Sequence, residues 1–591
     1  MGLNLHYRAI WILDFEYTAS VGDCPEPVCM VAHDLVSGQW IKLWQDALNK
    51  EPPPFDLGAD NILYVAFAAQ AEWSCFLQLG WPMPVRCLDL YAEFFCLHNG
   101  SVNGQLYPSL LAASGHYGIS SMGFSLKESM RDLILSGGPW TRAQRANILD
   151  YCASDVQATT DLLRIMLPQI AGNPQRLGQA LLRGRYTCAV SRMERNGVPI
   201  DVVFYRRLQK GWNEIKLKLI AEIDRDFGVF NGATFVSDRF ADFLQRAQIP
   251  WPRLPSGRLA LDDGTFKKQA KAYPMIARLR ELRHALAKLH QADFPIGSDG
   301  RMRTSLHPFA SKTGRNQPSN SRFIFGSARW LRSLIKPAPG RALAYVDWSA
   351  QEIAIAAALS GDHAMWEDYI SGDPYLAFAK KVGLAPADAT CYTHKSERQR
   401  AKAIVLGVGY GMSAESIALQ AGVHFEEART LLRQHRETYQ AFWQWVTNNQ
   451  NAGLLGLPLQ TTFGWTWHAG PGAEPNPRSL LNWPMQSNGA EMLRLACCEL
   501  TENDIQVCAP VHDALLVEAD IAEIDDVVKR TRTAMDHASE LVLGKGRVVR
   551  TNIDVVRFPD RYVEEAGNDL WHRITMLLNE LPMDDDGVVS K

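Results

Sequence analysis

The stretch Leu343-Ala-Tyr-Val-Asp-Trp-Ser-Ala-Gln-Glu352 decides how the rest of this chain is interpreted. The apolar, β-prone run that ends at Val346 predicts a buried strand, and Asp347 follows it directly. An alanine-rich helical pattern begins at Glu352, which puts Asp347 at a strand-to-helix turn. Its carboxylate has two interpretations there, as a ligand of a metal ion or as the N-cap of the next helix. Other parts of the chain have to decide between them.

A second carboxylate in a similar setting occurs near the C-terminus. The run from Ile505 to Glu518 predicts two apolar strands joined by the turn His512-Asp513. A plain hairpin turn of this length would contain Asn-Gly or Asp-Gly, so His-Asp is unusual. Asp513 is therefore the partner that a metal site at Asp347 needs. The pair favours the metal-ligand interpretation over the helix cap.

A helical pattern between these two carboxylates carries a stripe of residues spaced by four. Its members are Arg398, Lys402, Leu406 and Tyr410. Residues four apart share a helix face. Two cations one turn apart can bind a polyphosphate, and an apolar side chain followed by a ring can pack against a base. The alternative for this segment alone is an amphipathic helix with a basic edge.

Composition narrows the class of protein. The 591 residues are enough for several domains of roughly 100–200 residues each. No apolar run reaches the roughly 20 residues of a membrane span, and no signal-peptide cleavage pattern is present. Eleven scattered cysteines without a CxxC pair favour a reducing cytoplasm. The net charge of −3 means that nucleic acid would have to be bound by local basic patches.

The first 165 residues carry two short acidic motifs. Asp14 and Glu16 are two apart in an apolar strand pattern, so both carboxylates project from one face. Burying two carboxylates together is costly unless a cation neutralises them. Tyr151 and Asp155 are four apart in a helical pattern and share one helix face. Asp14 and Glu16 therefore indicate a cation site in the N-terminal part of the chain.

In this order, the two motifs resemble those of the DnaQ-like 3′–5′ exonucleases. In that family, acidic side chains bind two divalent metal ions, Mg²⁺ or Mn²⁺, and the tyrosine orients the attacking water. The resemblance implies that Asp14, Glu16 and Asp155 are metal ligands and that Tyr151 is catalytic.

The middle motif of the exonuclease family is degenerate in this chain. Ala68 and Ala71 stand where Asn and Phe are usual, and only the carboxylate remains, as Glu72. Glu72 is the expected metal ligand, with Asp89 as a fallback. Whether the exonuclease is active or only structural stays open at this point.

Two further polar segments have the residue types that bind DNA. The loop from Thr304 to Asn316 contains Thr313 and Arg315 among many donors, which suits contact with a phosphate backbone. A helix expected to run to about residue 502 begins with polar residues at four-residue spacing. These are Arg478, Asn482 and Gln486.

Taken together, these motifs resemble the family A DNA polymerases, the DNA polymerase I class, in a phage-type version. The resemblance covers the chain from Asp14 to about Phe558 and includes no 5′-nuclease domain ahead of the exonuclease-like part. It implies an α/β and α+β multidomain fold, in which an RNase H-like 3′–5′ exonuclease domain precedes a right-hand polymerase of palm, fingers and thumb. The expected segments are the exonuclease-like domain 1–170, thumb and connector 171–335, palm 336–362 and 451–570, fingers 363–450, and an acidic tail 571–591.

The resemblance also implies roles at the polymerase site. Asp347 and Asp513 would hold two Mg²⁺ ions, and Glu352 would exclude a ribose 2′-OH. The cations of the stripe would neutralise the triphosphate, and Tyr410 would lie near the templating position. The remaining expected DNA contacts are His512 at the primer terminus, Arg478, Asn482 and Gln486 in the minor groove, and Thr313 and Arg315 on the duplex backbone.

The chain departs from the family pattern at three places. Leu406 stands where Phe or Tyr is usual, which predicts altered incorporation rate and dideoxynucleotide discrimination. Ala514 replaces the usual second carboxylate of the hairpin, so two aspartates would have to suffice. Four members of the opening motif are also replaced, by Trp348, Ala350, Gln351 and Ala354.

The implied function is template-directed DNA synthesis from dNTPs with proofreading, in replication of a phage genome. The implied partners are primer-template DNA and dNTPs, with a monomeric enzyme in the cytoplasm, that of the host if the chain is phage-encoded. The alternatives are a repair-type polymerase with a weak or inactive exonuclease, a single-subunit RNA polymerase and a non-enzymatic DNA-binding protein. Glu352 as a ribose gate argues against the RNA polymerase.

Overall fold

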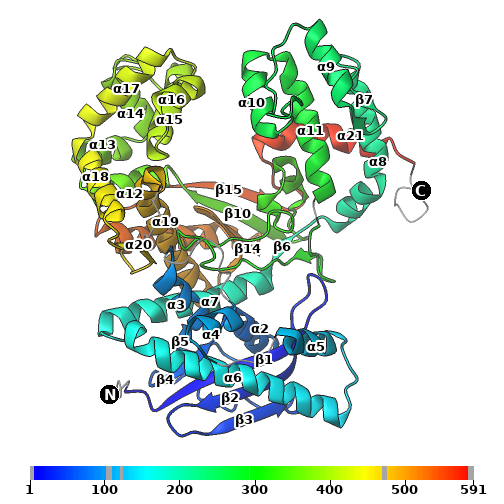
Figure 1. The fold of residues 1–591 in the computed structure, drawn as a ribbon, viewed down its shortest axis with the longest axis vertical. Helices are drawn as coiled ribbons and strands as arrows, with labels where there is room; N and C mark the ends of the chain where they lie inside the picture. The colour runs from blue at the N-terminus through cyan, green and yellow to red at the C-terminus, as the bar shows by residue number, and fades with distance from the viewer. Residues whose placement is uncertain (1–5, 101–108, 120–123, 292, 469–475, 583–591) are drawn as a thin grey trace. The chain divides into compact units, whose positions relative to one another are not determined.

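The computed structural model describes all 591 residues except 1–5, 101–108, 120–123, 292, 469–475 and 583–591 (Figure 1). The chain forms two compact units. The first consists of Met1–Asn196, Leu306–Gln317 and Leu343–Val555, and the second of Gly197–Ser305, Pro318–Ala342 and Val556–Lys591. The region expected as thumb and connector, 171–335, is therefore divided, because residues 171–196 and 306–317 pack with the first unit. In the described part of the chain, no helix is both long and apolar enough to span a bilayer.

A five-stranded sheet organises the N-terminal part of the first unit. Its order is β3-β2-β1-β4-β5. The strands are β1 (Ala9–Thr18), β2 (Glu26–Asp34), β3 (Trp40–Trp44), β4 (Ile62–Ala66) and β5 (Cys87–Asp89). β1 is antiparallel to β2 and parallel to β4. The expected strand at Asp14 is thus confirmed as a central strand.

Alternation along β1 fixes which side chains meet on each face. Ile10 and Ile12 enter one apolar core with α6 (Arg142–Ile170), while Trp11 and Leu13 enter the core on the other face with α2 (Gln70–Gln78). Asp14 and Glu16 continue the even-numbered face, which faces α6. Figure 1 shows α6 running along this sheet. The other helices of this part are α1 (Gln45–Leu48), α3 (Leu90–His98), α4 (Leu110–His116), α5 (Phe124–Leu135) and α7 (Pro174–Asn196).

A four-stranded sheet of order β13-β14-β10-β15 carries the opening stretch. The strands are β10 (Arg341–Trp348), β13 (Gln506–Val511), β14 (Ala514–Asp520) and β15 (Thr551–Arg557). Helices α12 (Gln351–Ser360), α19 (Pro477–Glu502) and α20 (Ile524–Leu543) pack together beside it. The N-cap of α12 is Ala350, at φ 52° and without a side-chain cap. Asp347 therefore lies inside β10 and is not a helix cap.

Six helices follow α12 in the segment expected as fingers. They are α13 (His363–Ile370), α14 (Pro374–Lys381), α15 (Lys395–Gly409), α16 (Ala414–Ala421), α17 (Phe425–Thr438) and α18 (Gln440–Leu454). α12 ends at Gly361, which has φ 67°, and Asp362 caps α13. A two-stranded ladder of β11 (Leu459–Gln460) and β12 (Thr466–Trp467) comes next.

The second unit is mainly helical. Its elements are β6 (Val198–Pro199), α8 (Val202–Asp224), β7 (Phe230–Asn231), β8 (Thr234–Phe235), α9 (Ser237–Arg246), α10 (Asp263–Ala272), α11 (Met275–Gln291), β9 (Arg301–Met302), η1 (Ile324–Gly326), η2 (Arg329–Leu334) and α21 (Glu565–Asn579). α21 includes the first residues of the expected tail 571–591, where Trp571 and Ile574 are buried and the helix packs on α8 and η2. An apolar face of this kind orders the segment. The expected acidic residues beyond it lie largely outside the described residues.

Candidate functional site

The two carboxylates at 347 and 513 meet at one end of the four-stranded sheet. β14 and β10 are neighbours, and the Trp348 amide donates to the Asp513 carbonyl oxygen at 3.0 Å. The predicted hairpin is confirmed, with Val511 paired to Ala514 and His512 at φ 55° in its two-residue turn. The positive φ explains the tight turn that presents Asp513 next to β10.

β15 brings two polar side chains to the same end of the sheet. Asn552 Nδ2 donates to Asp347 Oδ2 at 3.2 Å. Burial raises the pKa of Asp347, the Asn552 hydrogen bond lowers it, and the negative charges of Asp513 and Asp554 raise it. Burial also raises the pKa of Asp513, against the positive charge of Arg315. A bound divalent ion would stabilise the charged form of these crowded, half-buried carboxylates, which suit it as oxygen ligands.

Sequence reasoning missed Asn552 and Asp554. Both are exposed and two apart on β15, so they share a face of that strand. The polar alternation in Thr551-Asn-Ile-Asp-Val was the available signal. Ala514 is fully buried and supplies no carboxylate. Glu518 is buried further along β14, where it accepts from Gln506 Nε2 at 3.1 Å.

The expected ribose gate, Glu352, sits in the first turn of α12 and has two partners. Arg315 Nη2 lies 3.7 Å from Glu352 Oε1, and both side chains are about one-quarter exposed. Tyr410 is hydrogen-bonded to the Glu352 carboxylate. Burial raises the pKa of Glu352, whereas Arg315 and the Tyr410 bond lower it. Three residues far apart in sequence thus form one polar cluster.

The basic stripe is confirmed as one face of α15, with Tyr410 as the residue that follows the helix. Arg398 forms an ion pair with Asp373, which also caps α14. The ring of Tyr375 lies under both cations, 5.5 Å from the Arg398 guanidinium carbon and 5.5 Å from Lys402 Nζ. Sequence reasoning missed Asp373 and Tyr375, although the Asp-Pro pair at the start of a helix marks such a cap.

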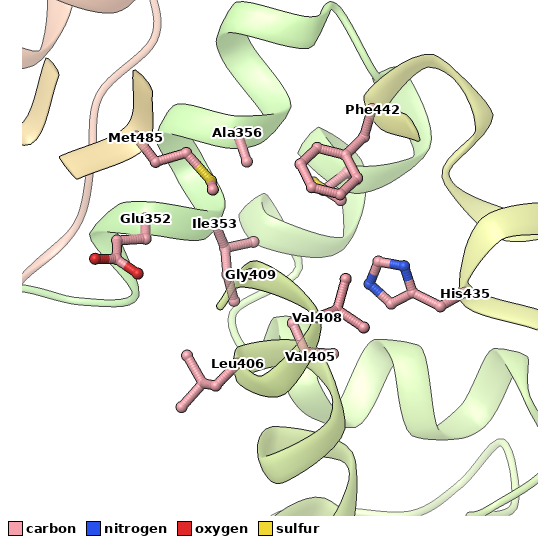
Figure 2. Close-up of a pocket in the computed structure, with 11 residues that line it drawn as sticks. Glu352, Ile353, Ala356, Val405, Leu406, Val408, Gly409, His435, Phe442 and Met485 are labelled. Carbon is pink, nitrogen blue, oxygen red and sulfur yellow. The ribbon is translucent and has the colours of Figure 1, made fainter. Parts of the chain in front are cut away.

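Leu406 lines a mostly apolar pocket between α12, α13, α15, α17, α18 and α19. Figure 2 shows Glu352 and Leu406 at one end of this pocket and His435 and Phe442 at the other. Met485 of α19 contributes to its wall. Leu406, which departs from the family pattern, therefore lines the same pocket as Glu352, the expected gate residue.

Backbone anchors hold the loop that carries Thr313 and Arg315. The Lys312 carbonyl accepts three side-chain N–H groups, those of Asn99 at 2.8 Å, Trp465 at 3.0 Å and Trp483 at 2.9 Å. Arg494 donates to the Gly314 carbonyl at 2.7 Å. Ser311 Oγ lies 3.1 Å from Thr313 Oγ1 and accepts the Arg315 amide at 2.9 Å. These bonds fix the loop backbone and leave the Arg315 side chain directed to Glu352.

The polar head of α19 forms one face. Arg478 is exposed, and Asn482 and Gln486 are half-buried at successive four-residue steps. A Cβ added to Gly411 would lie 3.0 Å from Cγ of Arg478, so this face begins next to Tyr410.

The N-terminal acidic motifs come together across β1 and α6. One ligand atom each from Asp14, Glu16 and Cys152 lies within 4.8 Å of the others. Burial, followed by the charge of Asp155, raises the pKa of Asp14 to about 8. Burial and the Asp14 charge also raise the pKa of Glu16. Cys152, which sequence reasoning missed, donates its thiol to Asp14 Oδ2 at 3.2 Å.

Glu72 is buried and engaged with β1. Its Oε2 accepts the Phe15 amide at 2.8 Å, and burial, then Asp14, raises its pKa. Glu72 is thus close to the acidic motifs. Asp89 instead accepts the amides of Ala68 and Tyr91, both at 2.9 Å, and caps α3. These bonds give Asp89 a structural role at the start of α3.

Comparison with known proteins defines the class. The family model "DNA polymerase family A" matches residues 260–555, half of the 591-residue chain. The chain therefore belongs to DNA polymerase family A.

The relatives agree with this assignment. DNA polymerase I of Aquifex aeolicus (strain VF5) is 23% identical over 459 residues, covering 71% of this chain and 77% of that protein. The thermostable DNA polymerase I of Thermus aquaticus is 24% identical over 382 residues, covering 59% of this chain and only 45% of that protein. Among solved structures, the POL domain of Pol1 from M. smegmatis, in a complex with DNA primer-template and dNTP, has a TM-score of 0.68 at 17% identity. The match covers 94% of this chain and 96% of that one, and at this identity it shows a shared fold.

Proposed function

We propose that this chain synthesises DNA from dNTPs on a primed DNA template. The observation that carries the proposal is the placement of Asp347 and Asp513 at adjoining strand ends, with family membership over residues 260–555. The resemblance to phage-type members assigns this synthesis to replication of a phage genome.

Asp347 and Asp513 are the residues that would hold two Mg²⁺ ions. When bound, these ions lower the pKa of the primer 3′-OH and neutralise the triphosphate. The half-buried, mutually repelling carboxylates fit such ions, because nearby positive charge relieves their repulsion. Asn552 orients Asp347 through its hydrogen bond. His512, in the same turn as Asp513, is assigned to the primer terminus.

Arg398 and Lys402 bind the β- and γ-phosphates in this proposal. The α15 helix sets them one turn apart, and the ring of Tyr375 contacts both cations. The Arg398–Asp373 ion pair opens, and Arg398 then binds the incoming polyphosphate. Glu352, held by Arg315 and Tyr410, occupies the space of a 2′-OH and so selects deoxynucleotides.

The DNA duplex is assigned to surfaces next to this cluster. Arg478, Asn482 and Gln486 present donors along one face of α19, and acceptors in the minor groove are common to all correct pairs. Thr313 and Arg315 stand on the anchored loop. Contacts of this kind position DNA without reading its sequence.

The second proposed activity is 3′–5′ proofreading at Asp14, Glu16, Glu72 and Asp155, with Mg²⁺ or Mn²⁺ as the ion. The clustered carboxylates with raised pKa values support a cation site. Tyr151 is hydrogen-bonded to Asp155, as one helix face predicts. The order of the five-stranded sheet supports the RNase H-like assignment of this part.

A repair-type polymerase with a weak exonuclease is the second candidate. One observation favours it: Glu72, the only remnant of the middle motif, already accepts the Phe15 amide. Degradation of a mismatched 3′ primer by wild type and Asp14→Ala decides between the two. Equal, background-level degradation would leave the repair-type polymerase.

Primer extension tests the main proposal. Wild type should extend a primed template with dNTPs and much less with rNTPs, and Asp513→Ala should abolish extension. Asp526→Ala, an exposed aspartate on α20, is the matched control and should extend normally. Extension by Asp513→Ala at the wild-type rate would contradict the assignment of the site.

A further inference from the structure

A lysine from another helix reaches into the N-terminal acidic cluster. Lys127 lies on α5, which packs against β1 and α6. Its Nζ is 2.6 Å from Asp155 Oδ1, and the two side chains are only 16% and 13% exposed. The same ammonium lies 5.9 Å from the ring centroid of Tyr151.

The Lys127 charge acts on the rest of the cluster as well. It lowers the pKa of Asp14 and of Glu16, against the larger effect of burial. A buried group of carboxylates needs positive charge nearby, and Lys127 supplies it. The ammonium therefore lies where the positive charge of a bound divalent cation would also stabilise these carboxylates.

We propose that Lys127 is an internal counter-ion that competes with the divalent cation for Asp155. The inference rests on the proposed exonuclease function of this site. An ion bound by Asp155 and Asp14 competes with the ammonium for the Asp155 carboxylate, because Lys127 Nζ already lies 2.6 Å from Asp155 Oδ1. Lys127 thus raises the concentration of metal ion that the site needs for binding, and it offsets part of the negative charge of the cluster until the ion binds.

A second lysine pair on α6 provides a matched control. Lys42 Nζ lies 3.0 Å from Asp150 Oδ1, but these side chains are 42% and 75% exposed. Exposed pairs contribute little and are screened by salt. Removing Lys42 changes the charge of the protein by the same amount without touching the acidic cluster.

The direct test is a calorimetric titration of Mn²⁺ into the full-length protein. Asp347→Asn and Asp513→Asn are combined as a background that removes the other expected ion site. The buffer is held at about pH 9, so that protons compete less for the buried carboxylates. Binding that disappears with a further Asp14→Ala substitution belongs to the N-terminal cluster.

In this background, Lys127→Met should bind Mn²⁺ about 10-fold more tightly, since competition and coupling of this kind are typically worth 5- to 150-fold. Lys127→Arg, which keeps the charge, should bind as the background protein does, as should Lys42→Met. Equal affinity of the Lys127→Met and background proteins would overturn the inference while leaving the exonuclease assignment intact. Absence of Asp14-dependent binding in all of them would overturn the exonuclease assignment, and the inference with it.

A measurement without substitution at Lys127 guards against misfolding of the variant. Amine-reactive labelling followed by mass spectrometry reports the reactivity of each lysine. Saturating Mn²⁺ should raise the reactivity of Lys127 several-fold and leave that of Lys42 unchanged. Unaltered Lys127 reactivity with the ion bound would show that the ammonium stays on Asp155 and would refute the competition.

Discussion

Asn552 offers the sharpest test of how the polymerase site is built, because nothing in the polymerase motifs points to it. Its Nδ2 donates to Asp347 Oδ2 at 3.2 Å from the neighbouring strand β15. Asn552→Ala removes this bond and leaves both aspartates in place. The substitution therefore measures what orientation of Asp347 contributes to nucleotide incorporation.

The expected magnitude follows from the geometry. A hydrogen bond to a charged group contributes about 1.5–3 kcal/mol. The 3.2 Å separation is at the long end for N–H to O, and Asn552 is exposed, so we take about 1 kcal/mol. That corresponds to roughly fivefold slower incorporation. The Asn552 hydrogen bond lowers the pKa of Asp347, so the variant should have a higher Asp347 pKa. On acidification its activity should therefore fall at a higher pH than that of wild type.

Single-turnover incorporation of one dNTP, measured as a function of pH, is the assay. Asp554→Asn is the matched comparison. Asp554 lies on the same face of β15 as Asn552, but the two residues shift the pKa of Asp347 in opposite directions. Its negative charge raises the pKa of Asp347, so its removal should move the acidic limb of the profile to lower pH. The two variants should bracket wild type.

A shift of both variants in the same direction would refute this reasoning, as would an Asn552→Ala enzyme with wild-type rate and profile. Either result would mean that β15 does not influence the Asp347 carboxylate during turnover.

Three further outcomes are expected. Arg183→Ala removes one partner of a buried ion pair, in which Arg183 Nε lies 2.6 Å from Glu93. It should destabilise the protein by about 3–5 kcal/mol, measured by chemical unfolding with the exposed Arg429→Ala as the control. A loss of less than about 1 kcal/mol would contradict this expectation. Burial lowers the pKa of His435 to about 3, so the folded protein keeps this side chain neutral. Its contribution to the free energy of unfolding should be fully present above about pH 6.5 and fall by up to about 1.4 kcal/mol per pH unit below it. His435→Gln should flatten that slope in thermal unfolding scans. Leu406→Phe should lower the KM for dNTPs about two- to tenfold through ring packing and change dideoxynucleotide discrimination; kinetics identical to wild type would contradict the role assigned to Leu406.

Much of the local structure was predictable because it depends on nearby residues. The buried strand before Asp347, the His512 hairpin and the Arg398 stripe follow from periods of two and four in the sequence. The helix stop at Gly361 and the cap at Asp362 follow from turn and cap chemistry. The helix at the start of the expected tail was not predictable, because the apolar face of α21 is buried only where α8 and η2 cover it.

The sites were predictable only in part. Family motifs identified Asp14, Glu16, Asp347 and Asp513 as candidate site residues. The fold brings Asp14 close to Glu16, and Asp347 close to Asp513. The neighbours that tune them come from distant segments with no local signal. Asn552 lies 205 residues from Asp347, and Lys127 lies 28 residues from Asp155 on a separate helix.

The sequence by itself determined the family, the strand and helix periods, and which acidic and basic residues can do chemistry, since these depend on residue type and spacing. Only the tertiary structure decided that Asp347 lies in a strand instead of capping a helix. It alone joined Glu352 to Arg315 and Tyr410, and placed Lys127 on Asp155. The physical reason is that charge–charge interactions and burial depend on distance in space, which the order of residues along the chain does not fix.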